Sequence, residues 1–384
     1  MKSISRSGPI SGVFRAADPR LGLGALANAR WSLLLLALTL ATVGLATIHS
    51  ASAELPVEYL PRQAIWIGLG LGAFLLLFSF DYQRLGTFAL AIYGGGILLL
   101  ALTLFAGQVR GGARGWLGFG GFAFQPAEVA KLTTAILLAR YLSGLSSLRL
   151  RLHEMGVASL IVALPMALLA LQPDYGSAAM FVPMLGIALV LAGIPWRALL
   201  VSGALVLAVG AVAWTTGIGI QTYQKERLLT FLQPERDPLG AGYQMRQSKI
   251  AVGSGELTGR GYMQGTQSQL RFLPARHTDF VFAVLAEEWG FVGVAIVLAL
   301  YALYLNGLVE VAMRARDRLG ILLVACLGSI LAVHVLYNTG MVVGLVPITG
   351  IPLPFLSYGG SFTLVNWIAV GLVLNVDYRR YVNR

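Results

Sequence analysis

The sequence predicts an all-α integral membrane protein with about ten transmembrane helices and one long extracytoplasmic loop. Of its 384 residues, 57% are hydrophobic and only 12% are charged, whereas about a quarter of the residues in a soluble domain are charged. Uncharged apolar windows such as 31–48 and 199–213 approach the length of about 20 residues that a helix needs to cross a bilayer. Basic residues are unevenly distributed between the connecting segments, and this asymmetry orients the chain.

Apolar segments separated by polar or Gly/Pro-containing stretches give the expected helices, in chain order: 31–50, 64–80, 86–106, 126–142, 157–172, 177–194, 198–216, 279–306, 319–340 and 361–376. They divide the chain into an N-terminal tail (1–30), a membrane domain (31–376) and a C-terminal tail (377–384). Residues 51–53 (Ala-Ser-Ala) resemble a signal-peptide cleavage site. Because the apolar stretch and the tail before them are longer than a signal peptide has, we expect the first helix to remain.

The basic residues place both termini in the cytoplasm. Short segments on the side of the N-terminus hold 15 Lys and Arg, against three in short segments on the other side: Arg62, Arg110 and Arg114. Cytoplasmic loops are the ones enriched in Lys and Arg. The net charge of +11 therefore reflects topology and attraction to anionic membrane lipid. No basic stripe interleaved with aromatic residues remains to bind nucleic acid.

Two extracytoplasmic segments are expected to carry the function. Segment 217–278 is long, polar and rich in glycine, and connections of that length are usually functional. Segment 341–360 is uncharged and contains three prolines and the pair Gly359–Gly360, so we expect it to dip into the outer leaflet or lie on it. Irregular backbone at membrane depth is tolerated only where it is buried in protein or lines a cavity.

Charged residues at the start of the fourth segment form the first candidate site. Glu128 and Lys131 follow Pro126, which suits the first turn of a helix. Three residues apart, they share one helix face and can pair. Charges in membrane helices are costly and usually face a partner or a cavity. The pair is therefore either a structural ion pair between helices or part of a pocket.

Two aspartates next to membrane segments are further candidates. Asp174 lies in a Pro/Gly turn, where it is either a turn former or helix cap or a functional carboxylate. Asp279 opens the eighth segment, beside Arg276 and His277. It is either an N-cap or a general base for a membrane-bound substrate, and it is the best single catalytic candidate. Glu287 and Glu288 follow on the same helix, and only Glu287 approaches the face of Asp279.

Other chemistries find less support in the sequence. Arg110 and Arg114 are either solvated rim residues or a binding site for a phosphate or diphosphate. The one cysteine, Cys326, and the four scattered histidines show no metal-ligand spacing. The sequence has neither a G-x-S-x-G nucleophile elbow nor a Walker loop or strand-flanked dinucleotide loop, which argues against a serine hydrolase and against ATP-driven transport.

These segments resemble the SEDS family of bacterial cell-wall polymerases, and its elongation member RodA more closely than its division member FtsW. The resemblance spans roughly residues 31–376 and is carried by Arg114–Trp116, Gln125–Glu128 with Lys131, Gln172–Gly176, Gly265–Gln269, Phe272–Pro274, His277–Phe282, Ala286–Glu288, Gly290–Phe291, Asn338–Met341 and Pro352–Gly360. Gly265–Gln269 before Phe272–Pro274 favours RodA. Two departures are Ala275, where the family commonly has Glu, and the longer N-terminal tail.

The resemblance implies a peptidoglycan glycosyltransferase of the bacterial cytoplasmic (inner) membrane that polymerises lipid II during cell elongation. It implies a class B penicillin-binding protein and other elongation-complex proteins as partners, and lipid II with its undecaprenyl chain as ligand. It also implies a divalent cation, Mg or Mn, for which the sequence offers no ligand set. By motif, the essential aspartate is Asp279. Arg114, Glu128, Lys131, Asp174, Arg276 and Ser357 are expected to bind substrate or to support the site.

The chemistry suggests a mechanism for such an enzyme. A base near the acceptor hydroxyl and positive charge near the diphosphate leaving group are required. We expect Asp279 to be the base, with inversion of configuration at the anomeric carbon. The positive charge is expected to come from Arg114, Lys131, Arg276 or a divalent cation. Glu128 is expected to orient Lys131. The alternatives are a lipid II flippase, for which no inverted repeat is evident, and a non-catalytic scaffold of the cell-wall machinery.

Overall fold

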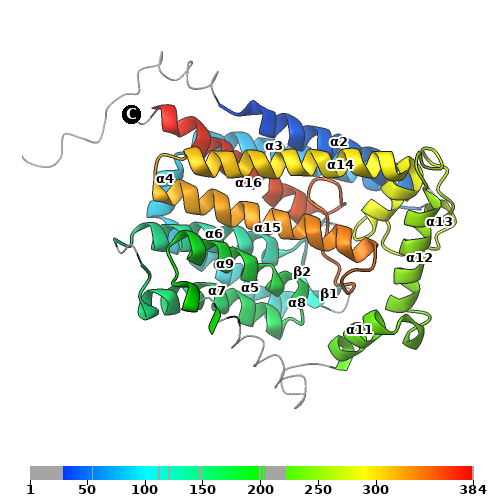
Figure 1. Cartoon of the computed structure of the whole chain (residues 1–384), viewed down its shortest axis with the longest axis horizontal. Helices are drawn as coiled ribbons and strands as arrows, with labels where there is room; N and C mark the ends of the chain where they lie inside the picture. Colours follow the sequence, from blue (N-terminus) through cyan, green and yellow to red (C-terminus); the bar gives the residue numbers. More distant parts are fainter. Residues whose placement is uncertain are drawn as a thin grey trace, which may run out of the picture.

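The computed structural model describes residues 29–382 except 54, 111–112, 120–121, 147–148, 199, 202 and 204–221. The described chain is a bundle of helices (Figure 1). The long helices are α2 (Trp31–Ser52), α3 (Tyr59–Ser79), α5 (Ala89–Ala106), α6 (Pro126–Ser143), α7 (Leu152–Leu171), α14 (Val281–Arg314), α15 (Arg318–Val342) and α16 (Gly360–Val382). The shorter helices α4 (Tyr82–Thr87), α8 (Tyr175–Ala179) and α9 (Phe181–Leu191) lie between them in the sequence.

Seven of the described helices are long and apolar enough to span a membrane: α2, α3, α5, α7, α14, α15 and α16. Helix α6 has the length but contains Glu128, Lys131 and Arg140, and α8 with α9 makes a shorter apolar stretch. The predicted seventh span, 198–216, lies almost wholly outside the described residues. The helical multi-pass membrane fold is therefore confirmed, and the count of ten spans stays a prediction.

A small antiparallel sheet forms in the outer loop before α6. Its strands are β1 (Gln108–Arg110), β2 (Ala113–Phe119) and β3 (Phe122–Phe124), in the order β1-β2-β3. Gln108 lies opposite Trp116, and Leu117 lies opposite Phe124. These strands were not predicted from the sequence. Because β3 ends just before α6, the sheet fixes where that helix begins.

The segment predicted to be a long extracytoplasmic loop, 217–278, contains helices in its described part. They are α11 (Thr222–Leu232), the 3₁₀ turn η1 (Pro234–Arg236), α12 (Ala241–Ser254) and α13 (Thr266–Gln269). Figure 1 shows α12 and α13 at one end of the bundle, opposite the end that holds the C-terminus. This arrangement agrees with the predicted topology, in which the C-terminus and the large loop lie on opposite sides of the membrane.

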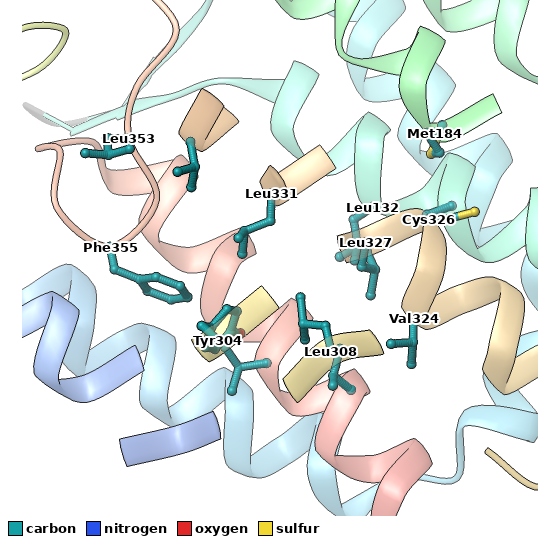
Figure 2. Packing of buried hydrophobic residues seen from close by; sticks show 14 of the residues in the cluster. Leu132, Met184, Tyr304, Leu308, Val324, Cys326, Leu327, Leu331, Leu353 and Phe355 are labelled. Carbon is teal, nitrogen blue, oxygen red and sulfur yellow. The ribbon is translucent and has the colours of Figure 1, made fainter. Parts of the chain in front are cut away.

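The second half of loop 343–359, residues 351–357, is mostly buried in the bundle, whereas Val343 and Leu345 are exposed. Leu353, Phe355 and Leu356 are each at most 3% exposed. The Phe355 ring packs edge-on against Tyr304 of α14, with ring centroids 5.6 Å apart, as Figure 2 shows. The Tyr301 hydroxyl donates to the carbonyl of Pro354. The irregular backbone is thus surrounded by protein, which is the condition for such backbone at membrane depth.

Helix α14 is kinked at Gly290, whose φ of 63° is left-handed. The segment Glu256–Gly261 lies against the kink, and its backbone takes up the groups that the kink leaves unpaired. Phe291 N donates to Glu256 O (2.9 Å), and Gly261 N donates to Glu288 O (3.0 Å). Gly259 also has a positive φ, and a Cβ there would overlap the backbone of Glu288. Glycine at these two positions lets the loop and the helix approach backbone to backbone.

We expect Gly70→Val to destabilise the protein by about 1–3 kcal/mol, because a Cβ at Gly70 would overlap the fully buried Trp367 ring where α3 packs along α16. Gly72→Val is the matched control, since a Cβ there meets no atom within 4 Å. Thermal unfolding of both variants in detergent measures the difference. Equal unfolding temperatures for the two variants would contradict the packing described for α3 and α16.

Candidate active site

Asp279 lies just before α14 and is held by its backbone rather than by its carboxylate. Its carbonyl accepts a hydrogen bond from Asn338 Nδ2 (2.8 Å). The carbonyl of Thr278 accepts one from Ser357 Oγ (2.6 Å). The N-cap of α14 is Phe280, and no side chain caps that end. The alternative that Asp279 serves as an N-cap is therefore wrong, and the helix begins at Val281 instead of the predicted residue 279.

The carboxylate of Asp279 faces loop 343–359. A Cβ placed on Gly350 would lie 3.3 Å from Asp279 Oδ2. Burial raises the pKa of Asp279 to about 6, while a hydrogen bond from Thr278 and the charge of Arg227 act in the opposite direction. The group is therefore largely ionised at pH 7 and close enough to neutrality to accept a proton, as a general base requires.

His277, two residues before Asp279, is held between aromatic rings. Its ring centroid lies 4.2 Å from that of Tyr59 and 5.9 Å from that of Tyr358. Burial and the neighbouring Arg276 lower the pKa of His277 to about 4. It is therefore neutral at pH 7, so the local field at Asp279 has no imidazolium contribution.

Glu128 and Lys131 form the predicted pair inside the protein. Lys131 Nζ lies 2.8 Å from Glu128 Oε2, and both residues are less than 5% exposed. Lys131 Nζ also lies 3.2 Å from Nε2 of His334 on α15. His334 Nδ1 lies 3.0 Å from the carbonyl oxygen of Pro352. Because that carbonyl can only accept, Nδ1 carries the proton and Nε2 accepts from Lys131.

Asn338 and His334 join the two halves of the site, and the sequence analysis assigned a role to neither. Four residues apart, they lie on one face of α15. Asn338 Nδ2 donates to the carbonyls of Ile351 and Asp279, each at 2.8 Å, while His334 bonds to the next loop carbonyl, Pro352. The spacing of these two polar residues in an otherwise apolar segment is the signal that could have revealed them.

Asp174 caps a helix, as one of its two interpretations predicted. Its Oδ1 accepts from Ser177 N (3.0 Å) at the start of α8. Its Oδ2 accepts from Ser177 Oγ and from Gln125 Nε2 (3.1 Å), the residue just before α6. A Cβ on Gly176 would lie 3.2 Å from the carbonyl oxygen of Thr349. The turn that Asp174 shapes therefore lies against loop 343–359, next to the residues that face Asp279.

The other predicted residues take different positions. Arg114 is exposed on β2 and donates from Nη1 to Leu104 O (3.4 Å). The buried Arg276 donates to the carbonyls of Ala51 and Ser268, a geometry that favours support of the loop over contact with substrate. Ser357 is also a supporting residue, because its hydroxyl accepts from Leu353 N (2.8 Å) and donates to Thr278 O. The side chain of Arg110 lies outside the described residues.

Glu287 and Glu288 have hydrogen-bond partners other than Asp279 and its neighbours. Glu287 accepts from Gln267 N (2.8 Å) and Ser268 N (3.2 Å) at the start of α13. Glu288 accepts from the Ser50 hydroxyl of α2. Glu287 thus holds the segment around α13 on α14, and Glu288 links α14 to α2.

Comparison with known proteins decides the family. Residues 30–382 match the cell cycle protein family of FtsW, RodA and SpoVE. The chain belongs to this family. It is 39% identical over 350 residues to the peptidoglycan glycosyltransferase MrdB of Escherichia coli K12, covering 91% of this chain and 93% of that protein. It is 33% identical over 422 residues to the peptidoglycan glycosyltransferase RodA of Treponema pallidum, covering 91% and 97%.

Solved structures of the family share the fold. One, from a study of how a peptidoglycan synthase complex coordinates polymerization and crosslinking, superposes with a TM-score of 0.80 at 35% identity, covering 93% of this chain and 99% of that one. The crystal structure of the rod shape-determining protein RodA of Thermus thermophilus superposes with a TM-score of 0.69 at 32% identity, covering 92% and 98%. The described helices therefore have the arrangement of a RodA-type protein.

In the part of the chain that the structure describes, no group of three or more His, Cys, Asp or Glu side chains could hold a metal ion. The divalent cation stays a prediction from resemblance.

We expect Lys131→Met to cost about 3–5 kcal/mol, because it leaves the buried Glu128 charged and unpaired. The double variant Glu128→Gln with Lys131→Met removes both charges and should recover most of that loss. Arg140→Met, an exposed position on the same helix, is the matched control and should have little effect. Thermal unfolding in detergent measures these three variants and the single variant Glu128→Gln, and simple additivity of the Glu128 and Lys131 effects would contradict the pairing.

Proposed function

We propose that the protein is a peptidoglycan glycosyltransferase that polymerises lipid II at the outer face of the cytoplasmic membrane, with Asp279 as general base. The names of its relatives support the activity. The observation that carries the residue assignment is the position of Asp279: its carboxylate caps no helix and faces Gly350 in loop 343–359. Such a carboxylate is available to a substrate that remains in the membrane.

The reaction joins a sugar 4-hydroxyl to the anomeric carbon of a lipid-linked sugar. Asp279 accepts the proton of the attacking hydroxyl while the oxygen attacks the anomeric carbon from the face opposite the leaving group. The bond from that carbon to the diphosphate oxygen breaks, so configuration inverts and undecaprenyl diphosphate leaves with the electron pair. The raised pKa of Asp279, about 6, places the base near the operating pH, where proton transfer is most effective.

Positive charge near the leaving diphosphate is the second requirement. Lys131 is the better placed of the predicted cations, because Glu128 orients it and His334 links it to the loop beside Asp279. Arg114 is exposed on the outer sheet and is available to the substrate headgroup. The protein is proposed to work in cell elongation with a class B penicillin-binding protein, which would cross-link the glycan strands. The similar structure from a study of how a peptidoglycan synthase complex coordinates polymerization and crosslinking supports such a partner.

Asp279→Asn is expected to reduce lipid II polymerisation by at least a hundredfold, because an amide cannot accept the proton and general-base catalysis contributes about 10²–10⁴-fold. The measurement resolves labelled glycan products on a gel, with purified protein, with and without the partner and divalent cation. Asp81→Asn, at the opposite end of the bundle where the residue caps α4, is the matched control and should keep activity, since Asn is an equally good cap.

Full polymerisation by folded Asp279→Asn would refute the base assignment. Absence of product from wild type under every condition would refute the polymerase. Leaflet-resolved transport of lipid II by the purified protein would then favour the flippase, and partner binding without turnover or transport would favour the scaffold.

The rate of polymerisation should fall as pH drops below about 6, because Asp279 must be ionised to accept a proton and its pKa is raised to about 6. Arg227→Gln should move this acid limb to higher pH, since the Arg227 charge lowers that pKa. Arg236→Gln, an exposed neighbour on η1, should leave the limb in place. A pH–rate profile tests both expectations; a limb at the ordinary carboxyl value of about 4 would contradict them.

A further inference from the structure

A polar cavity of about 310 Å³ lies between α11, α12 and loop 343–359. Its walls carry Glu226, Arg227, Thr230, Asp237, Gln244 and Ile348. None of these residues has a role in the mechanism above, apart from the effect of Arg227 on the pKa of Asp279. A cavity of this size is at the lower end of the range for small-ligand pockets, about 300–1,000 Å³.

The cavity adjoins the catalytic aspartate. Ile348 belongs to the loop whose Gly350, two residues further on, faces the carboxylate of Asp279. Arg227 lines the cavity, and its charge acts on the same carboxylate. A molecule that extends from the reaction centre by one sugar unit therefore has this cavity within reach.

The walls are fixed to the membrane helices. Ser248 Oγ of α12 donates to Val342 O at the end of α15 (2.7 Å). Tyr337 of α15 donates to Pro347 O (3.0 Å), next to Ile348. Asp237 accepts from Gly240 N and Ala241 N (2.9 and 2.7 Å), which holds the start of α12. The backbone around the cavity is thus held on the membrane helices, and the carboxylate of Asp237 is held in place by the start of α12.

The charges of the lining argue against an anion. The lining has two carboxylates, Glu226 and Asp237, and one cation, Arg227. Its net charge is therefore negative, and a diphosphate would be repelled. The remaining polar groups are the hydroxyl of Thr230, which is only 4% exposed, and the amide of Gln244. Hydroxyl, amide and carboxylate groups together offer both donors and acceptors, and Ile348 adds an apolar surface. This combination suits a neutral sugar ring with several hydroxyl groups.

We infer that this cavity is a subsite for one neutral hexosamine unit of the glycan strand, next to the bond-forming centre at Asp279. The inference rests on the proposed function and deepens it. It assigns Thr230 and Gln244 to recognition of sugar hydroxyl and acetamido groups. It also implies that α11 and α12 hold the glycan while the carboxylate of Asp279 acts on the next sugar unit.

The test separates recognition from chemistry. Thr230→Val with Gln244→Ala should raise the KM for lipid II about tenfold, as expected for the loss of one to two hydrogen bonds, and change kcat by less than twofold. Gln233→Ala, exposed between α11 and η1 and outside the lining, is the matched control and should change neither. An unchanged KM in the double variant, or a loss confined to kcat, would overturn the inference.

A binding measurement is independent of turnover. Saturation-transfer NMR with the full-length protein carrying Asp279→Asn should detect chitobiose, a neutral β-1,4-linked disaccharide of N-acetylglucosamine, and the signal should disappear when Thr230→Val and Gln244→Ala are added. Binding lost in this way would support the subsite even if wild type failed to polymerise lipid II, in which case only the proposed function would fail. Chitobiose binding that survives both substitutions, or that inorganic diphosphate displaces, would overturn the subsite.

Discussion

The structure depends on the pairing of irregular backbone within a bundle of membrane helices. Backbone polar groups at membrane depth have no water to bond, so a loop can lie there only if protein supplies a partner for each group. Loop 343–359 meets this condition through side chains that come from distant parts of the chain. Asn338 and His334 of α15 and Tyr301 of α14 bond to its carbonyls, and Gln63 of α3 accepts from Gly359 N. These bonds determine where the loop lies, and the loop in turn determines what surrounds Asp279.

The same bonds couple the two charged parts of the candidate site. Lys131 reaches the loop through His334, and the backbone of Asp279 reaches it through Asn338, one helical turn away on α15. Because packed cores shift between discrete arrangements rather than deforming continuously, a displacement of α15 would alter the surroundings of the cation and of the base together. A buried ion pair is weak evidence for stability; here its geometry fits a role in positioning, which matches the sequence-based hypothesis that Glu128 orients Lys131.

Much of the fold and part of the site could be predicted from local patterns. Composition and basic-residue asymmetry gave the membrane class, and the three-residue spacing of Glu128 and Lys131 gave their ion pair. The spacing of His334 and Asn338 marks them as polar residues on one helix face, but their bonding partners could not be predicted, because only the fold brings those backbone carbonyls near; Asn338 bonds to Asp279, 59 residues earlier. The interpretation of Asp279 as the N-cap of α14 was wrong for the same reason. Asn338 and Ser357 hold residues 278–279 from outside the helix, and local helix propensity carries no information about such distant contacts.

The kink in α14 has a consequence for how the protein is made. At Gly290 the ladder of helical hydrogen bonds is interrupted, and the segment Glu256–Gly261 supplies the missing partners from the extracytoplasmic side. That segment precedes α14 in the chain, and in the predicted topology it crosses the membrane before it can meet the kink. With that topology, the groups left unpaired at Gly290 gain their partners only once the loop has been translocated and folds back onto α14. In the predicted topology, the kink next to the candidate site is therefore completed only after the membrane helices have been inserted.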